Sequence, residues 1–173
     1  AQWNDFANIV EFGTTIKARN QAREYGDENP RLTFTTIGDK VEGKPILRCE
    51  ATTKSGCGRY TIHIEPGTIT DEAVDFEDGY LVVTQAPLYV TVENATRETG
   101  VANPVFNITY DGFKNEETAD VLTTKPVASC IADATSQAGT YEIIVSGGEA
   151  DNYELFYNNG WLTVTPSTSF ISG

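Results

Sequence analysis

Apolar and polar residues alternate with a period of two along much of the chain. In residues 88–93, Leu, Val and Val alternate with Tyr, Thr and Glu, and the same alternation recurs in residues 106–110, 141–145, 153–157 and 162–164. A period of two is typical of strands that bury one face. The pattern predicts about six short strands in each half of the chain, and therefore an all-β fold.

The segment 115–122 is the one helix candidate, and it is too short to be stable without packing against other elements. Two layers of antiparallel strands are the simplest way to bury one face of every strand. We therefore predict two tandem small β-sandwich modules of the immunoglobulin-like kind. β-Grasp-like modules, with a sheet wrapped on a short helix, are the alternative.

The chain also contains an internal repeat. Residues 44–84 align without a gap onto residues 125–165, at a constant offset of 81 (125 − 44). Upstream, residues 23–30 align onto residues 97–104, at an offset of 74 (97 − 23). The difference of seven residues indicates an insertion in the second copy, at residues 113–124, and such insertions lie in surface loops.

Charge excludes two classes of partner. The chain has 12 Lys and Arg against 25 Asp and Glu, which gives a formal net charge of −13. Such a chain repels nucleic acid and anionic membrane surfaces. Because no apolar run approaches the roughly 18 residues that a membrane helix needs, we also expect no membrane-spanning segment.

The second copy carries a series of short motifs in a fixed order. They include Arg97-Glu-Thr-Gly100, Asn103-Pro104, Gly112-Phe113, Gly139-Thr-Tyr141, Asp151-Asn-Tyr153, Asn159-Gly160 and Leu162-Thr-Val164-Thr165. This series resembles the MBG domain (YGX type) that occurs in tandem in bacterial surface proteins. The first copy keeps Tyr25-Gly26 and Gly58-Arg59-Tyr60 but lacks the Gly112-Phe113 and Asp151-Asn-Tyr153 motifs. It is therefore interpreted as a degenerate member.

The segment Trp3-Asn-Asp-Phe6-Ala-Asn8-Ile9-Val10, with its string of Trp, Phe and Ile, precedes the repeats. This string looks like the closing segment of bacterial leucine-rich-repeat surface proteins. We therefore divide the chain into a remnant of an upstream domain at 1–13, a first β module at 14–86, a second at 87–166 and a tail at 167–173.

The resemblance implies a non-catalytic module of an extracellular or cell-surface bacterial protein, which acts as a stalk or spacer or supports adhesion. It implies no catalytic residue and no cofactor. Its partners would be neighbouring domains of the same chain, with a host or matrix protein or a glycan as further candidates. The alternative function is carbohydrate or host-ligand binding, with the outward-facing aromatic side chains of Tyr89, Phe156 and Trp161 as stacking platforms.

One acidic run is the best metal candidate, because Ca²⁺ prefers several carboxylate oxygens in one loop. It consists of Asp71, Glu72, Asp75, Glu77 and Asp78. The spacing is not that of an EF-hand, and the matching stretch of the second copy keeps fewer acids. We favour a solvated acidic loop over a calcium site.

Two recurring motifs suggest structural roles. Gly26 and Gly100 follow Arg23-Glu24 and Arg97-Glu98 at the same place in each copy, and we expect both glycines to take a positive φ in a turn between the first two strands. Tyr60 and Tyr141 also occupy matching positions. If the copies share one fold, these two tyrosines have equivalent surroundings.

The remaining candidates are the three cysteines and the single histidine. The alternation directs Cys49 and Cys130 inward, where free thiols act as small hydrophobic side chains. Cys57 has no counterpart, and it either pairs with Cys49 or stays free. His63 lies on a strand between inward-facing isoleucines, so we expect it to face outward and to have no catalytic role.

Overall fold

The structure is a computed structural model that describes residues 13–168. The described chain divides into two compact units, which we call modules, with the boundary between Thr84 and Gln85. The described residues contain no helix long and apolar enough to cross a membrane. The leucine-rich-repeat-like segment, from Trp3 to Val10, lies outside the described residues.

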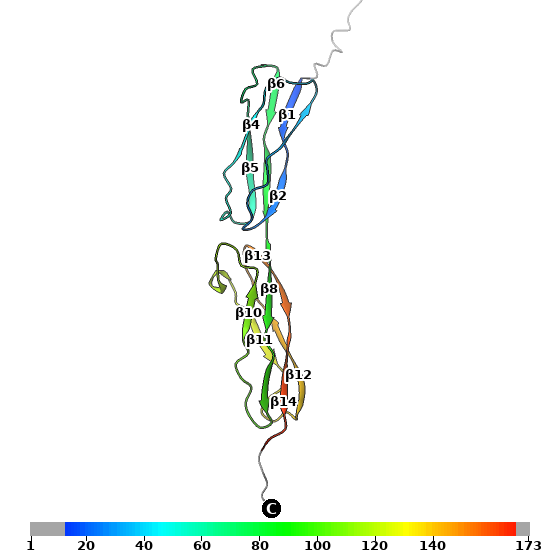
Figure 1. Cartoon of the computed structure of the whole chain (residues 1–173), viewed down its shortest axis with the longest axis vertical. Coiled ribbons are helices and arrows are strands. Elements are labelled where there is room, and N and C mark those ends of the chain that lie inside the picture. The colour runs from blue at the N-terminus through cyan, green and yellow to red at the C-terminus, as the bar shows by residue number, and fades with distance from the viewer. Residues whose placement is uncertain (1–12, 169–173) are drawn as a thin grey trace, which may run out of the picture. The chain divides into compact units, whose positions relative to one another are not determined.

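The first module has seven strands. They are β1 (Thr14–Ala18), β2 (Gln21–Glu24), β3 (Phe34–Ile37), β4 (Ile46–Cys49), β5 (Gly58–Glu65), β6 (Val74–Glu77) and β7 (Gly79–Thr84). A three-stranded sheet has the order β3-β1-β6, and a four-stranded sheet has the order β2-β7-β5-β4. Figure 1 shows both sheets in the blue to green part of the chain.

The second module repeats this plan with seven further strands. They are β8 (Ala86–Val92), β9 (Ala95–Glu98), β10 (Ile108–Asp111), β11 (Val127–Cys130), β12 (Gly139–Ser146), β13 (Tyr153–Asn158) and β14 (Gly160–Thr165). Their sheets have the orders β10-β8-β13 and β11-β12-β14-β9. Each strand thus occupies the place of the strand seven positions earlier, and the prediction of two tandem all-β modules is confirmed.

The core of each module consists of apolar side chains at alternate strand positions. The largest fully buried ones are Ile16, Ile62, Leu81 and Val83 in the first module and Leu88, Val90, Val92, Ile143, Leu162 and Val164 in the second. All ten lie on strands of the two sheets, and alternation sends their side chains to one face. The period of two in the sequence therefore marks the buried faces correctly.

The expectation of purely antiparallel layers was wrong. β1 pairs in parallel with β6, and β2 pairs in parallel with β7; in the second module β13 pairs in parallel with β8, and β14 with β9. The cause is that two nearly continuous stretches of each module pass from the three-stranded sheet into the four-stranded sheet. These stretches are β1–β2 and β6–β7 in the first module and β8–β9 and β13–β14 in the second. The Asn159-Gly160 motif forms no hairpin turn, because Asn159 alone separates β13 from β14, which lies in the other sheet.

Side-chain oxygens accept hydrogen bonds where the strands change sheets. In the second module the Trp161 backbone N–H donates to Asn94 Oδ1 (2.9 Å), and the Val145 N–H donates to Asn159 Oδ1 (3.0 Å). The first module has the same bonds, from Tyr80 N to Asn20 Oδ1 and from Ile64 N to Asp78 Oδ1, both 3.0 Å. These oxygens satisfy backbone N–H groups for which the interrupted ladder supplies no carbonyl.

The insertion of the second module does not form the expected helix over residues 115–122. Asn115 and Glu116 have positive φ values (55° and 60°), which interrupt a right-handed helix. Only a 3-10 helix remains at η2 (Ala119–Val121), with Thr118 at its N-cap. Because residues 13–168 contain no α-helix that could pack on a sheet, the β-grasp alternative does not apply.

Candidate functional site

A buried arginine ties three segments of the second module together. Arg97, on β9, is 7% exposed, and its guanidinium donates to Asn103 Oδ1 (2.7 Å), to the Glu98 carbonyl (3.1 Å) and to the Asp133 carbonyl (2.5 Å). The Asn103 amide in turn donates to the Ala132 carbonyl (2.7 Å). The planar guanidinium can make these bonds at once because its donors form a rigid fork. The group joins β9 to the loops that follow β9 and β11.

The first module has the same group. Arg23 on β2 is 8% exposed and donates to Asn29 Oδ1 (2.8 Å), to the Glu24 carbonyl (3.2 Å) and to the Thr52 carbonyl (2.6 Å). The Asn29 amide donates to the Ala51 carbonyl (2.8 Å). Every donor and acceptor therefore recurs at the repeat offsets.

The glycine that follows each arginine forms a turn. Gly26 and Gly100 have φ values of 87° and 86°, in the region that favours glycine. Because Arg23 and Arg97 lie within the second strand of their module, each turn follows the second strand. The expectation of a turn between the first two strands was therefore wrong in its position.

The tyrosines at matching positions make the same contact. The Tyr60 hydroxyl donates to the Gly56 carbonyl (2.7 Å), and the Tyr141 hydroxyl donates to the Gln137 carbonyl (2.8 Å). Each bond holds the start of a long central strand, β5 or β12, against the loop that precedes it. The two tyrosines therefore have equivalent surroundings.

Two of the three aromatic candidates lie together on the outer face of the three-stranded sheet. Tyr89 on β8 and Phe156 on β13 are paired in register, and their rings stack with centroids 5.5 Å apart and an interplanar angle of 28°. Asp111 lies beside Tyr89 on β10. Trp161 lies on β14, in the other sheet. The structure therefore gives one aromatic pair, which we call the Tyr89–Phe156 platform, and one separate tryptophan.

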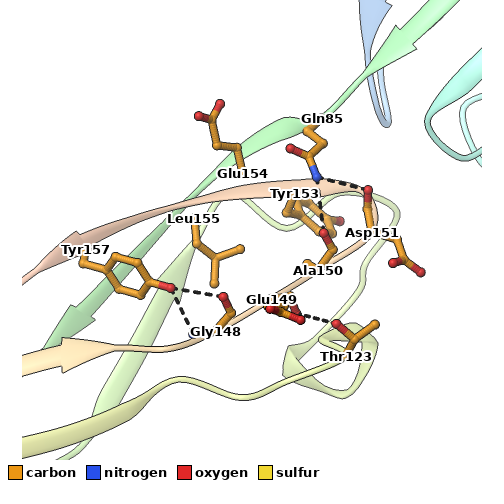
Figure 2. A pocket seen from close by; sticks show the side chains of 10 residues that line it. All are labelled: Gln85, Thr123, Gly148, Glu149, Ala150, Asp151, Tyr153, Glu154, Leu155 and Tyr157. Carbon is orange, nitrogen blue, oxygen red and sulfur yellow. Dashed lines mark hydrogen bonds between the residues drawn. The ribbon is translucent and has the colours of Figure 1, made fainter.

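An open hollow of about 380 Å³ adjoins β13 and the loop before it (Figure 2). Across it, Gln85 Nε2 donates to the carbonyls of Ala150 and Asp151 (both 3.3 Å), and the Gly148 N–H donates to the Tyr157 hydroxyl (3.0 Å). These bonds, drawn in Figure 2, hold the loop in place. The hollow was not expected from the sequence, because its lining combines residues of β13 with loop residues that have no periodicity.

The equivalence of the two modules agrees with a comparison against known families. The chain matches the MBG domain (YGX type) over residues 14–82 and 88–163. It belongs to this family. The two matched segments fall one in each module, and the family is associated with bacterial surface proteins. No curated protein matches the chain.

The second MBG domain has a tyrosine that the sequence analysis did not assign to any role. Tyr153 is buried, its hydroxyl accepts the Lys114 N–H (2.9 Å) and donates to Glu117 Oε1, and its ring meets Phe113 edge-on at 5.4 Å. The matching position of the first MBG domain is Glu72 (153 − 81). This explains why the insertion and the Asp151-Asn-Tyr153 motif are absent together from the first domain.

The acidic candidates of the first MBG domain are not gathered around one point. Asp71 Oδ1 accepts the Ala73 N–H (2.9 Å), and Glu77 lies 3.9 Å from the Lys17 ammonium on the neighbouring strand. Asp78 accepts the Ile64 N–H at the sheet change. Asp75 and Glu72 are exposed. In residues 13–168, no three Asp, Glu, His or Cys side chains are placed to share a metal ion.

The three cysteines all lie within residues 13–168, form no disulfide there and are half-buried. Cys49 and Cys130 lie at the ends of β4 and β11, opposite Ile62 and Ile143. The open question about Cys57 is thus answered in part, because no disulfide joins it to Cys49. His63 lies on β5 between two buried isoleucines and forms an ion pair with Asp78 (Nδ1–Oδ2 3.6 Å) when protonated.

Two pKa shifts reflect the local environment in the second MBG domain. Partial burial, and secondarily the nearby Tyr157, raise the pKa of Tyr110 above its ordinary value. At Asp133, hydrogen bonds from the Thr135 hydroxyl (2.5 Å) and the Thr135 N–H (2.8 Å) lower the carboxyl pKa below its ordinary 3.8, and the charge of Arg97 lowers it further. The carboxylate form of Asp133 is therefore the one that the folded turn favours.

We expect the second domain to lose stability in acid partly through Asp133. Because the pKa of Asp133 is lowered on folding, its stabilising effect is present above the ordinary value of 3.8 and is lost as the pH falls through the lower folded-state value. Thermal melts at pH 6 and pH 3 of the natural chain and of Asp133→Asn measure this. The melting temperature of the second domain should fall less between pH 6 and pH 3 in the variant than in the natural chain. An equal fall in both would contradict the assignment. The first domain is the internal control, because Thr52 occupies the matching position.

Proposed function

We propose that this pair of MBG domains is a non-catalytic spacer of a bacterial cell-surface or secreted protein, which carries or supports an adhesive part. An upstream leucine-rich-repeat domain would be such a part. One observation supports the proposal above all. In each domain the first strand pairs in parallel with the strand that leads directly into the last.

This pairing makes the chain enter and leave a domain at opposite ends. In the second domain, Tyr153 on β13 is level with Ala86 at the start of β8, and Asn158 is level with Thr91. β14 then continues in the same direction to Thr165, as Figure 1 shows. At about 3.3 Å per residue, the stretch from Tyr153 to Thr165 spans roughly 40 Å. Every inserted domain would thus add length to the parent protein.

The same pairing suits a segment that bears tension. When the two ends of the second domain are pulled apart, β8 and the β13–β14 stretch are pulled in opposite directions along their axes. All hydrogen bonds of the β8–β13 ladder are then loaded together, whereas a hairpin pulled from one end loses its bonds one at a time. β1 and β6 are arranged in the same way in the first domain.

Single-molecule force spectroscopy on the full chain tests the proposal. We expect two separate unfolding steps, each of which lengthens the chain by roughly 240 Å, the extended length of a domain minus its folded span. Ile16→Ala and Val90→Ala, at equivalent buried positions, should each lower the force of a different step. A smooth extension without separate steps would contradict the proposal.

Carbohydrate binding is the second candidate function, and the Tyr89–Phe156 platform favours it. Both rings are exposed, and polar groups flank them, including Asp111, Glu154 and Asn158. Flat aromatic faces suit the apolar face of a sugar ring, and the polar groups suit its hydroxyls. The first domain has Thr15 and Asp75 at the positions of the two rings (89 − 74 and 156 − 81), so the binding would belong to the second domain.

A glycan array followed by titration separates the two candidates. Saturable binding that is lost in Phe156→Ala and kept in Trp161→Ala supports the platform, because Trp161 lies on the other sheet. The absence of binding to every glycan removes the second candidate and leaves the spacer. Binding that survives Phe156→Ala would also contradict the role of the platform.

A further inference from the structure

Four large apolar side chains are exposed on the outer face of the four-stranded sheet of the second domain or directly after its edge strand β11, and we call them the β11 patch. They are Val127 (64% exposed), Ile131 (89%), Ile144 and Trp161. The register places Ser129 opposite Ile144, and Glu142 opposite Trp161, so these side chains share one face. Glu142 therefore lies among apolar neighbours.

The β11 patch borders an unpaired strand edge. β11 is the outermost strand of its sheet, and in the described part of the chain only β12 pairs with it. An antiparallel neighbour uses the N–H and C=O groups of every second residue. The remaining backbone groups of β11 point outward and can accept one further strand.

The matching edge of the first domain is protected by charge. Arg48 stands at the place of Ser129 and forms ion pairs with Glu50 (3.5 Å) and Glu65 (3.1 Å). Glu50 replaces Ile131, and His63 replaces Ile144 (offset 81). Charged side chains are a common means of preventing strand addition at an edge. The first domain thus has this protection, and the second lacks it on the same backbone.

The first domain also indicates which kind of side chain would lie over the ring of Trp161. The aromatic ring at that place is Tyr80, and the guanidinium of Arg59 lies over it, 4.0 Å from the ring centroid. In the second domain Thr140 replaces Arg59, so the arginine that covers the ring in the first domain has no counterpart, and Glu142 replaces Thr61 beside Trp161. An aromatic face next to a carboxylate favours a cation from outside the domain.

We propose that the β11 patch binds an extended basic segment of a partner polypeptide. The segment adds as a strand along β11, its apolar side chains cover Val127, Ile131 and Ile144, and a lysine or arginine lies over Trp161 next to Glu142. Charge favours such a partner over a second copy of this chain. Residues 85–173 contain Arg97, Lys114 and Lys125 against eleven Asp and Glu (3 − 11 = −8), and Arg97 is buried. Two such domains repel each other.

The test uses the full chain with Trp3→Phe, which leaves Trp161 as the single tryptophan. The probe is a short synthetic peptide of alternating arginine and valine. We expect a saturable change in Trp161 fluorescence and slower amide exchange along β11. Two control peptides should not bind, one with glutamate in place of arginine and one with a central proline, which cannot donate to the strand ladder.

Variants copied from the first domain supply the second half of the test. Ser129→Arg with Ile131→Glu restores the charged edge, and Thr140→Arg places a cation over Trp161. Each change should weaken peptide binding by about tenfold or more, because Ser129→Arg adds like charge, Ile131→Glu removes an apolar contact, and Thr140→Arg occupies the face of Trp161. Val105→Glu, at another exposed valine, adds a comparable charge in the loop before β10 and should leave binding unchanged.

Three outcomes would overturn the proposal. The first is the absence of binding by the basic peptide. The second is equal binding by the proline peptide or by the Ser129→Arg, Ile131→Glu variant. The third is self-association of the chain that Ile131→Glu abolishes, because it would assign the patch to a second copy. None of these outcomes bears on the spacer or on the Tyr89–Phe156 platform.

Discussion

Replacement of Arg97 by methionine is expected to destabilise the second domain by about 3 to 5 kcal/mol. Arg97 is 7% exposed, and its removal leaves Asn103 Oδ1 and the Asp133 carbonyl without their donor. Hydrogen bonds to a charged group contribute about 1.5 to 3 kcal/mol each. For a domain of this size the melting temperature should fall by roughly 15 °C or more. Calorimetry of the full chain measures it as a shift of one of two transitions.

The first domain supplies the matched control for this experiment. Arg23→Met should shift the other transition by a similar amount, because Arg23 makes the same bonds to Asn29, Glu24 and Thr52. Lysine should not stabilise the second domain in place of Arg97, since the single ammonium of Arg97→Lys cannot reproduce the guanidinium fork. A shift of less than about 1 kcal/mol in Arg97→Met, the size of one ordinary hydrogen bond, would show that the network does not hold the loops.

Gly160→Ala should destabilise the second domain by about 3 kcal/mol, the upper range for overpacking in a closed site. A Cβ atom at Gly160 would lie 2.6 Å from the Val92 carbonyl oxygen and 3.2 Å from Asn94 Oδ1. These atoms cannot withdraw easily, because Val92 ends the central strand β8 and Asn94 accepts the Trp161 N–H. Chemical denaturation followed by circular dichroism measures the loss.

Gly147→Ala separates this steric effect from the general cost of replacing glycine. Gly147 has a φ of 84°, and no atom lies within 4 Å of a Cβ built there. Its replacement should cost about 1 to 2 kcal/mol, from the left-handed backbone alone. Gly79→Ala should reproduce the larger effect in the first domain, where the Cβ would lie 2.5 Å from the Ala18 carbonyl oxygen. Equal losses in Gly147→Ala and Gly160→Ala would contradict the close approach.

The sequence was sufficient to predict the repeat, the all-β class and the buried faces. Side chains alternate across a strand, so the apolar positions of segments such as 88–92 and 141–145 mark the inner face directly. The repeat then extends each assignment to the other copy. The arginine that recurs at 23 and 97 was also recognisable as structural, because it keeps its place before a glycine in both copies.

Strand direction could not be predicted, because no local signal reports a change of sheet. Asn159-Gly160 looks like a hairpin turn, yet the chain continues in the same direction from β13 to β14. The role of Tyr153 was also hidden. Its partners, Lys114 and Glu117, lie 39 and 36 residues away, in a loop without periodicity.

The candidate sites required a comparison of the two copies on a shared backbone. From the sequence alone, Tyr89, Phe156 and Trp161 formed one group of outward aromatic residues. The structure places the first two together and the third on the other sheet, beside an unprotected edge. The two copies therefore share the arginine–asparagine hydrogen-bond network that holds their loops, and they differ in the side chains on their outer surfaces.

Cross-strand nuclear Overhauser effects on the isotope-labelled full chain test the central claim most directly. The claim is that both halves are one sandwich in which the first strand runs parallel to the strand before the last. The predicted result is a set of parallel-type contacts at equivalent places, between Ile16 and Phe76 and between Val90 and Tyr157. Antiparallel contacts between these strands, or parallel contacts in one half only, would contradict the account.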